Sequence, residues 1–266
     1  MQRCPQFITG DFEPHHKFLP DDEYGRALDS LVKACSDVLV VDPRSSRIYL
    51  GKRCVEPQPD WWYIGGRVKP GDTPQQGAAR NVHRELGLDL PSERFAVLAN
   101  YSFVWQTRTQ PPICNGTADI STIHVLELTV EEAGKVVLDP KEYSDARWFD
   151  PDELLVGDFH PALKMAVRDL QARNAYLELE RAIVTGASVG EVATVARALV
   201  AAHTVDGLRA GTAIKVRFDK RGYEYEGPRV LDGGAPAAGI GARTGYMELP
   251  CVIGLVVGAA FMLLRN

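Results

Sequence analysis

The chain has 266 residues, of which 45% are hydrophobic and 24% are charged, and its formal net charge is −5. This length and composition predict one or two globular domains with a sizeable core. The acidic balance argues against nucleic-acid binding through a general basic surface. The cysteines are odd in number, irregularly spaced and without a C-x-x-C pair, which favours a reducing compartment over a zinc site or a disulfide framework. The N-terminus lacks the apolar core of a signal peptide, so we expect a cytoplasmic protein.

The first part of the chain predicts a lead-in followed by a strand-rich domain. Residues 1–24 are polar and proline-rich, which indicates an irregular segment, and we place a domain at 25–174. Apolar runs bounded by turn residues predict strands, the first two forming a hairpin. These runs are 38–41, 48–51, 61–66, 95–105, 120–130 and 146–149. Helical spacing predicts a further helix at 160–183.

A helix from Thr73 to about Leu86 has clear start and stop signals. Thr73 is suited to the N-cap, Pro74 to the first helical position, and Gln76 completes a capping box with Thr73. Gly87 is suited to ending the helix. The helix follows two glycines, Gly65 and Gly66, that end a strand and let the backbone approach a ligand.

The chain beyond residue 174 differs in composition. Residues 175–230 predict a small helix-plus-hairpin extension, and 231–248 form a Gly/Ala-rich linker. The tail at 249–266 contains sixteen uncharged residues, 249–264, which as a helix would be about 24 Å long, shorter than a hydrocarbon core of about 30 Å. Two interpretations stay open: a helix packed on the domain, or a tail anchor in an intracellular membrane with the domain facing the cytosol.

The segment from Gly65 to Leu88 predicts an oxygen-rich site beside the two glycines. Asn81, Arg84 and Glu85 share one face of the helix because they are spaced i, i+3 and i+4. A carboxylate beside exposed carbonyl groups is suited to Mg²⁺, which also binds substrate phosphates. Arg67 and Arg80 are near enough in sequence to meet phosphate oxygens.

This segment resembles the box of the Nudix hydrolase superfamily, which ends in Arg-Glu-apolar-x-Glu-Glu-x-Gly-apolar. The matching residues are Gly66, Arg80, Val82, Glu85, Gly87 and Leu88, with Asp72 in place of the first glutamate. The resemblance implies a Nudix α/β/α sandwich with a mixed sheet, followed here by a small C-terminal α+β extension and the hydrophobic tail. Asn81 and Arg84 stand where the family usually has metal-binding glutamates. Because two like charges ~4 Å apart repel by roughly 4 kcal/mol at an intermediate dielectric, Arg84 disfavours a second cation, and we expect a single Mg²⁺.

Within the superfamily, the chain is similar to the GDP-mannose mannosyl hydrolase branch over about residues 18–170. Segments that carry this similarity include WWYIGGRV (61–68), NGTAD (115–119) and EYSDARWFDPDELL (142–155). The branch hydrolyses the bond between the sugar and the diphosphate, so the resemblance implies release of a nucleoside diphosphate and a free sugar. It further implies that Mg²⁺ is held by the carbonyl of Gly65 and the side chains of Glu85 and Glu142, and that substrate is bound by Arg53, Arg67 and Arg80.

The general base is the point at which the chain departs most from this branch. Tyr143 stands where the branch has its catalytic histidine, and a phenol with a reference pKa of about 10 is a poor base at neutral pH. The remaining candidates are Glu142 and His124, the latter in a predicted strand.

Three functions therefore follow from the sequence. The first is Mg²⁺-dependent hydrolysis of a nucleotide sugar, such as GDP-mannose or GDP-glucose. The second is hydrolysis of a phosphoanhydride bond with Glu142 as the base, and the third is a catalytically inactive protein that binds or tethers a nucleotide sugar. The expected partner is the small-molecule nucleotide sugar and no nucleic acid, while a homodimer and a membrane contact through 249–264 stay open.

Overall fold

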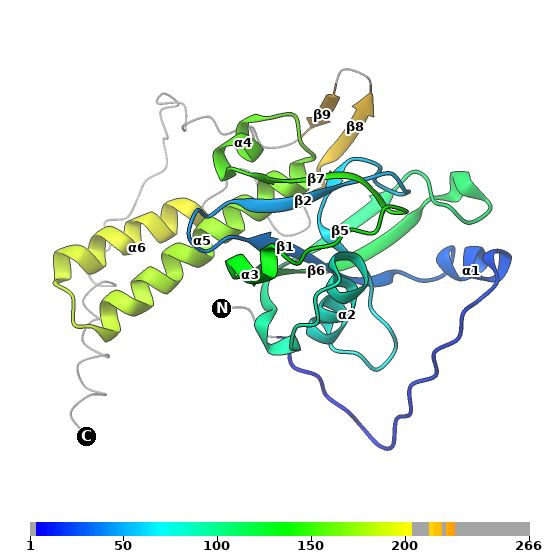
Figure 1. Cartoon of the computed structure of the whole chain (residues 1–266), viewed down its shortest axis with the longest axis horizontal. Helices are drawn as coiled ribbons and strands as arrows, with labels where there is room; N and C mark the ends of the chain where they lie inside the picture. The colour runs from blue at the N-terminus through cyan, green and yellow to red at the C-terminus, as the bar shows by residue number, and fades with distance from the viewer. Residues whose placement is uncertain (1–3, 204–212, 220–221, 227–266) are drawn as a thin grey trace, which may run out of the picture. The chain divides into compact units, whose positions relative to one another are not determined.

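The computed structural model describes residues 4–203, 213–219 and 222–226 (Figure 1). The linker predicted at 231–248 and the hydrophobic tail predicted at 249–266 lie outside these residues. Among the described helices, none combines the length and the apolar character that a membrane span needs.

The centre of the fold is a 7-stranded mixed sheet in which β3, β2, β1, β6 and β5 are successive neighbours. Two further strands complete it, with β4 paired to β1 and β7 paired to β2. β1 runs parallel to β6 and antiparallel to β2 and β4. The strands are β1 (Lys33–Val41), β2 (Ile48–Arg53), β3 (Trp61–Trp62), β4 (Ile64–Arg67), β5 (Ala96–Trp105), β6 (Thr117–Glu127) and β7 (Tyr143–Phe149).

Helices cover both faces of this sheet. Besides two 3₁₀ turns, Ser92–Arg94 and Ile113–Asn115, they are α1 (Asp21–Leu28), α2 (Pro74–Leu86), α3 (Val130–Ala133), α4 (Pro151–Val156), α5 (Pro161–Val184) and α6 (Val189–His203). α2 packs on one face through a core cluster that includes Val38, Ile64 and Val82. α4 and α5 pack on the other through a cluster that includes Leu39, Leu154 and Leu163. The α/β/α sandwich predicted from the sequence is therefore confirmed.

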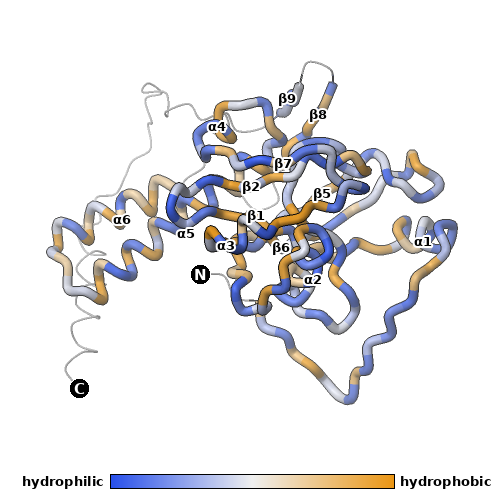
Figure 2. Tube along the Cα trace, in the orientation of Figure 1, coloured by the Kyte–Doolittle hydropathy of each residue, from blue (hydrophilic) through white to orange (hydrophobic). Residues whose placement is uncertain are grey.

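The alternation of side chains along β1 explains why its apolar run is continuous. Successive residues of a strand point to opposite faces, so Val38 and Leu39 enter different core clusters. A strand buried on both faces needs apolar residues at both sets of positions. Figure 2 shows apolar stretches within β1 and β5, interrupted by polar residues.

Helix α2 has the ends that its sequence predicts. Thr73 Oγ1 accepts a hydrogen bond from the backbone of Gln76 (3.1 Å), and the Gln76 side chain accepts one from the backbone of Thr73 (2.8 Å). Gly87 ends the helix with φ 68°, a left-handed conformation that glycine adopts without strain. This fixed start and end set which residues of α2 face β4.

Two expected boundaries are placed differently in the structure. The irregular lead-in ends before Asp21, where α1 begins, because three acidic residues at its start favour a helix N-terminus. The boundary expected between residues 174 and 175 falls inside α5, which continues unbroken to Val184. Within the range 175–230, the described residues include α6 and the hairpin of β8 (Lys215–Asp219) and β9 (Gly222–Glu226).

Candidate active site

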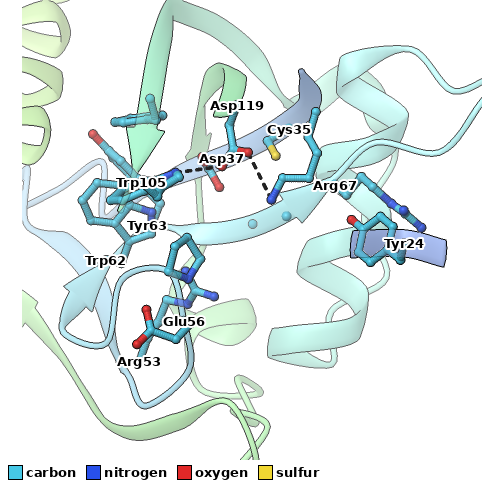
Figure 3. Close-up of a pocket in the computed structure, with 15 residues that line it drawn as sticks. Tyr24, Cys35, Asp37, Arg53, Glu56, Trp62, Tyr63, Arg67, Trp105 and Asp119 are labelled. Atoms are coloured by element: carbon cyan, nitrogen blue, oxygen red, sulfur yellow. Dashed lines mark hydrogen bonds and ion pairs between the residues drawn. The ribbon is translucent and has the colours of Figure 1, made fainter. Parts of the chain in front are cut away.

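A cavity of about 170 Å³ opens beside the two glycines of β4 (Figure 3). Side chains from α1, the sheet and the loop after β2 form its walls. It is lined by Tyr24, Lys33, Cys35, Asp37, Arg53, Glu56, Pro57, Trp62, Tyr63, Gly65, Gly66, Arg67, Phe103, Trp105 and Asp119. Cationic, carboxylate and aromatic groups thus meet in one small space next to the predicted ligand-binding backbone.

Two of the three predicted substrate arginines line the cavity. Arg53 is half-buried at the end of β2, and Arg67 is exposed at the end of β4 with its guanidinium 5.0 Å from the ring centre of Tyr24. Arg80 does not line the cavity: it forms an ion pair with Asp72 (3.0 Å) and donates a hydrogen bond to the carbonyl of Arg67 (3.3 Å). Arg80 therefore supports the backbone that carries Arg67.

Aromatic rings form one side of the cavity, and Arg67 with Tyr24 lies on the other (Figure 3). Trp105 stacks on Phe103 with ring centres 5.2 Å apart and an interplanar angle of 19°. The indole nitrogen of Trp105 donates a hydrogen bond to Asp119 (2.9 Å), and Asp119 also pairs with Lys33 (3.1 Å). The indole is thus held in place by its polar edge while its apolar surface meets the cavity.

Asp37 is a cavity residue that the sequence did not single out. It lies in the middle of β1, accepts a hydrogen bond from Ser121 (2.6 Å), and faces the cavity beside Gly65. Burial raises the pKa of Asp37 to about 6. The only sequence signal is a carboxylate within an otherwise apolar strand, which predicts a paired or functional group without distinguishing the two.

Glu85, the one carboxylate retained at the end of the box, is completely buried and fully engaged by donors. Its Oε2 accepts hydrogen bonds from the backbone of Gly65 (3.1 Å) and from the hydroxyl of Tyr143. Its Oε1 forms an ion pair with Arg84. Burial raises the pKa of Glu85, and the Arg84 charge and the Tyr143 hydrogen bond oppose that rise.

Two of the three expected magnesium ligands contact the Arg84 guanidinium, and the charge of the third, Glu142, acts on it. Arg84 Nη2 lies 3.4 Å from the carbonyl oxygen of Gly65 and contacts Glu85. Burial alone would lower the pKa of Arg84. The carboxylates of Glu85 and Glu142 have the larger effect and raise the pKa of Arg84. Over the described residues, no group of three or more His, Cys, Asp or Glu side chains gathers to hold a metal. As arranged, these residues do not fit a divalent ion.

The other candidates for the general base lie in different surroundings. Tyr143 is buried, and burial together with Glu85 raises its pKa, so its hydroxyl is a donor rather than a base. His124 is buried within β6, does not line the cavity, and has a pKa lowered to about 4 by burial. Glu142 is half-buried in the turn just before β7 and also lies outside the cavity lining. Among these candidates for the general base, Asp37 alone lines the cavity.

The extension holds a loop that lines the site, which the sequence did not predict. The Tyr223 hydroxyl of β9 bonds to Asp60 (2.8 Å) and accepts a hydrogen bond from Gln58 (2.5 Å). The backbone of Tyr223 bonds to Asp158 (2.8 Å). These contacts fasten the loop between β2 and β3, which supplies Glu56 and Pro57 to the cavity.

Comparison with known proteins identifies the class that this fold and site define. A model of the NUDIX domain matches residues 33–170. An uncharacterized Nudix hydrolase, orf19 of Rhodococcus erythropolis, is 30% identical over 168 residues, covering 56% of this chain and 85% of the relative. The chain therefore belongs to the Nudix hydrolase family, whose members generally use divalent metal ions such as Mg²⁺.

Solved structures of the family resemble part of the chain. The MutT NUDIX hydrolase from Burkholderia pseudomallei is 20% identical with a TM-score of 0.43, covering 53% of this chain and 99% of that one. The E. coli dihydroneopterin triphosphate pyrophosphohydrolase is 20% identical with a TM-score of 0.36, covering 51% of this chain and 87% of that one.

Proposed function

We propose that this Nudix hydrolase cleaves a nucleoside diphosphate sugar into a nucleoside diphosphate and a free sugar. The observation that carries the proposal is the convergence of Arg53, Arg67 and Trp105 on one cavity. Guanidinium groups bind diphosphate oxygens with directed hydrogen bonds, and an indole surface suits a base or a sugar ring. GDP-mannose and GDP-glucose are the first substrates to test because the sequence resembles that branch of the family.

The size of the cavity limits what it encloses. Pockets that surround a whole small-molecule ligand measure roughly 300–1,000 Å³, and this cavity measures about 170 Å³. It therefore accommodates one part of a nucleotide sugar, and the remainder extends over Arg67 and Tyr24 at the open edge.

The residues of the cavity suit displacement at the anomeric carbon. Water forms a bond to that carbon, the bond from the carbon to the terminal diphosphate oxygen breaks, and the diphosphate leaves with the electron pair. Arg53 and Arg67 stabilise the negative charge that develops on the leaving group. Asp37 accepts the proton of the attacking water, since its carboxylate lines the cavity and titrates near neutral pH.

A single labelling experiment tests this assignment. The full chain is incubated in heavy-oxygen water with GDP-mannose or GDP-glucose, with added Mg²⁺ and separately with a chelator, and the products are analysed by mass spectrometry. We expect GDP and a free sugar that carries the label. Label in a phosphate group would reject attack at carbon. Binding without turnover under both conditions would instead support a sensor or tethering protein.

Membership in the Nudix family favours one other reaction, hydrolysis of a phosphoanhydride bond. In that case Glu142 is the base that the sequence indicates, and the expected products of GDP-mannose are GMP and a sugar phosphate. Glu142→Gln and Asp37→Asn then separate the two reactions, because each removes the base of only one of them.

A further inference from the structure

We infer that the Arg84 guanidinium is a built-in cation that takes the place of the divalent ion in this Nudix site. Its positive charge lies among the oxygens that the sequence assigned to Mg²⁺, so the wild-type chain keeps this place closed to a metal. The inference concerns the box helix and holds for any substrate, so it does not rest on the proposed function.

The first support is the position of the guanidinium. Arg84 Nη2 lies 3.4 Å from the carbonyl oxygen of Gly65 and pairs with Oε1 of Glu85. The charge of Glu142 acts on the same guanidinium. Two predicted ligands thus contact one guanidinium directly, and the charge of the third adds to the negative potential around it.

The second support is that hydrogen-bond donors already face the oxygens around the glycines. Asn81, where the family usually has a glutamate, donates from Nδ2 to the carbonyls of Ser36 (3.2 Å) and Gly66 (3.0 Å). The Tyr143 hydroxyl and the backbone of Gly65 donate to Oε2 of Glu85. A metal ligand must offer a free lone pair, and these donors occupy the lone pairs that face them.

The third support is charge. Two carboxylates and one guanidinium leave little net negative charge to attract a divalent ion, and an ion placed beside Arg84 is repelled by it. Arg84 has a half-exposed side chain, whereas Glu85 is completely buried. Substitution of Arg84 therefore changes the charge of the site without opening the core, which makes the inference testable on the folded protein.

The test measures binding of Mn²⁺ alone by electron paramagnetic resonance, with Mn²⁺ as a spectroscopic substitute for Mg²⁺. Arg84→Glu restores the carboxylate that the family has here, and Arg84→Gln removes only the charge. The matched control is His83→Glu, which adds the same carboxylate at the neighbouring exposed position. Melting curves of all proteins with and without Mn²⁺ provide a second readout.

We expect no stoichiometric Mn²⁺ binding by the wild type or by His83→Glu. Arg84→Glu should bind one ion at least about tenfold more tightly than the wild type and melt at a higher temperature with the ion than without it. If Arg84→Glu does not fold, Arg84→Gln decides, with the same direction expected. One tightly bound Mn²⁺ in the wild type, or no gain in either Arg84 variant, would overturn the inference.

Discussion

The hydroxyl of Tyr143 donates a hydrogen bond to the buried carboxylate of Glu85, joining the first residue of β7 to the last turn of α2. The Tyr143 ring also occupies the space in which a side chain at Gly51 would lie. A position that the branch resemblance assigned to a catalytic base is therefore a buried structural donor in this chain.

Removal of this donor should cost stability. Tyr143→Phe leaves Glu85 with one hydrogen bond fewer in the interior, and an underbonded buried group typically costs about 1–3 kcal/mol. Urea unfolding should show a corresponding fall in the free energy of unfolding, while Tyr176→Phe, at a more exposed position on α5, should not. Equal stability of Tyr143→Phe and the wild type would contradict the assigned hydrogen bond.

The two cavity arginines should govern substrate affinity. Arg53→Met and Arg67→Met each remove a charge-assisted contact to the diphosphate, so we expect KM to rise by about tenfold or more. Arg47→Met is the control, because Arg47 pairs with Asp150 (3.2 Å) and lies outside the cavity. Steady-state kinetics with GDP-mannose measure the effect. An unchanged KM in both cavity variants would show that Arg53 and Arg67 do not bind the diphosphate.

Asp37 should produce an acid limb in the pH profile. Its ionised form is the base, and burial raises its pKa to about 6, so kcat/KM should rise as the pH passes through that value. Asp37→Asn should lose this limb and most of the activity. Because the raised pKa means that ionisation costs the folded state stability, the same variant should gain stability above pH 6 relative to the wild type. Loss of activity together with loss of stability would instead indicate a structural role.

His160 should make the fold sensitive to acid. Burial lowers its pKa to about 3, and its Nδ1 accepts a hydrogen bond from the backbone of Ala162 (3.1 Å) at the start of α5. The unfolded chain binds the proton near pH 6.5 and the folded chain does not, so this residue's contribution to stability is lost as the pH falls from 6.5 toward 3. His160→Asn keeps an N-cap acceptor. Its free energy of unfolding, measured by urea denaturation, should fall less steeply across this pH range than that of the wild type. An unchanged slope would argue against a neutral, buried His160.

The hairpin of β8 and β9 should affect the site through a single hydroxyl. Tyr223→Phe removes the bonds to Asp60 and Gln58 and so loosens the loop that carries Glu56 and Pro57. We expect a higher KM with little change in the melting temperature. Tyr176→Phe, at a more exposed position on α5, is the comparison. Identical KM values for the two variants would show that the loop holds its shape without the hairpin.

The sandwich and the box helix follow from local signals, which is why the sequence predicts them. The capping residues of α2 act within one turn, and the apolar run of β1 reflects burial on both faces. Arg53 was expected at the site only through the family resemblance, whereas Arg67 follows the glycines in sequence, and both line the cavity.

The sequence did not predict contacts that depend on the three-dimensional path of the chain. Asp37 is separated by 84 residues from Ser121, its hydrogen-bond donor, and nothing local indicates that its side chain faces a cavity. The direction in which Arg84 points was equally hidden, because an exposed arginine on a helix can extend into solvent or fold back on the preceding strand. His124 was a candidate base from the sequence, but it is buried in β6 and does not line the cavity. Its position within a predicted strand did not indicate how deeply its side chain is buried.

Tyr24 and Tyr223 both lie outside residues 33–170, yet one covers Arg67 and the other fastens the loop beside the cavity. The family boundary and the boundary of the working enzyme are therefore different. A fragment trimmed to the family domain would retain Glu85 and the glycines but lose Tyr24, which lines the pocket, and Tyr223, which fastens a loop beside it. Variation in these flanking segments offers a route by which substrate preference changes while the box itself stays constant.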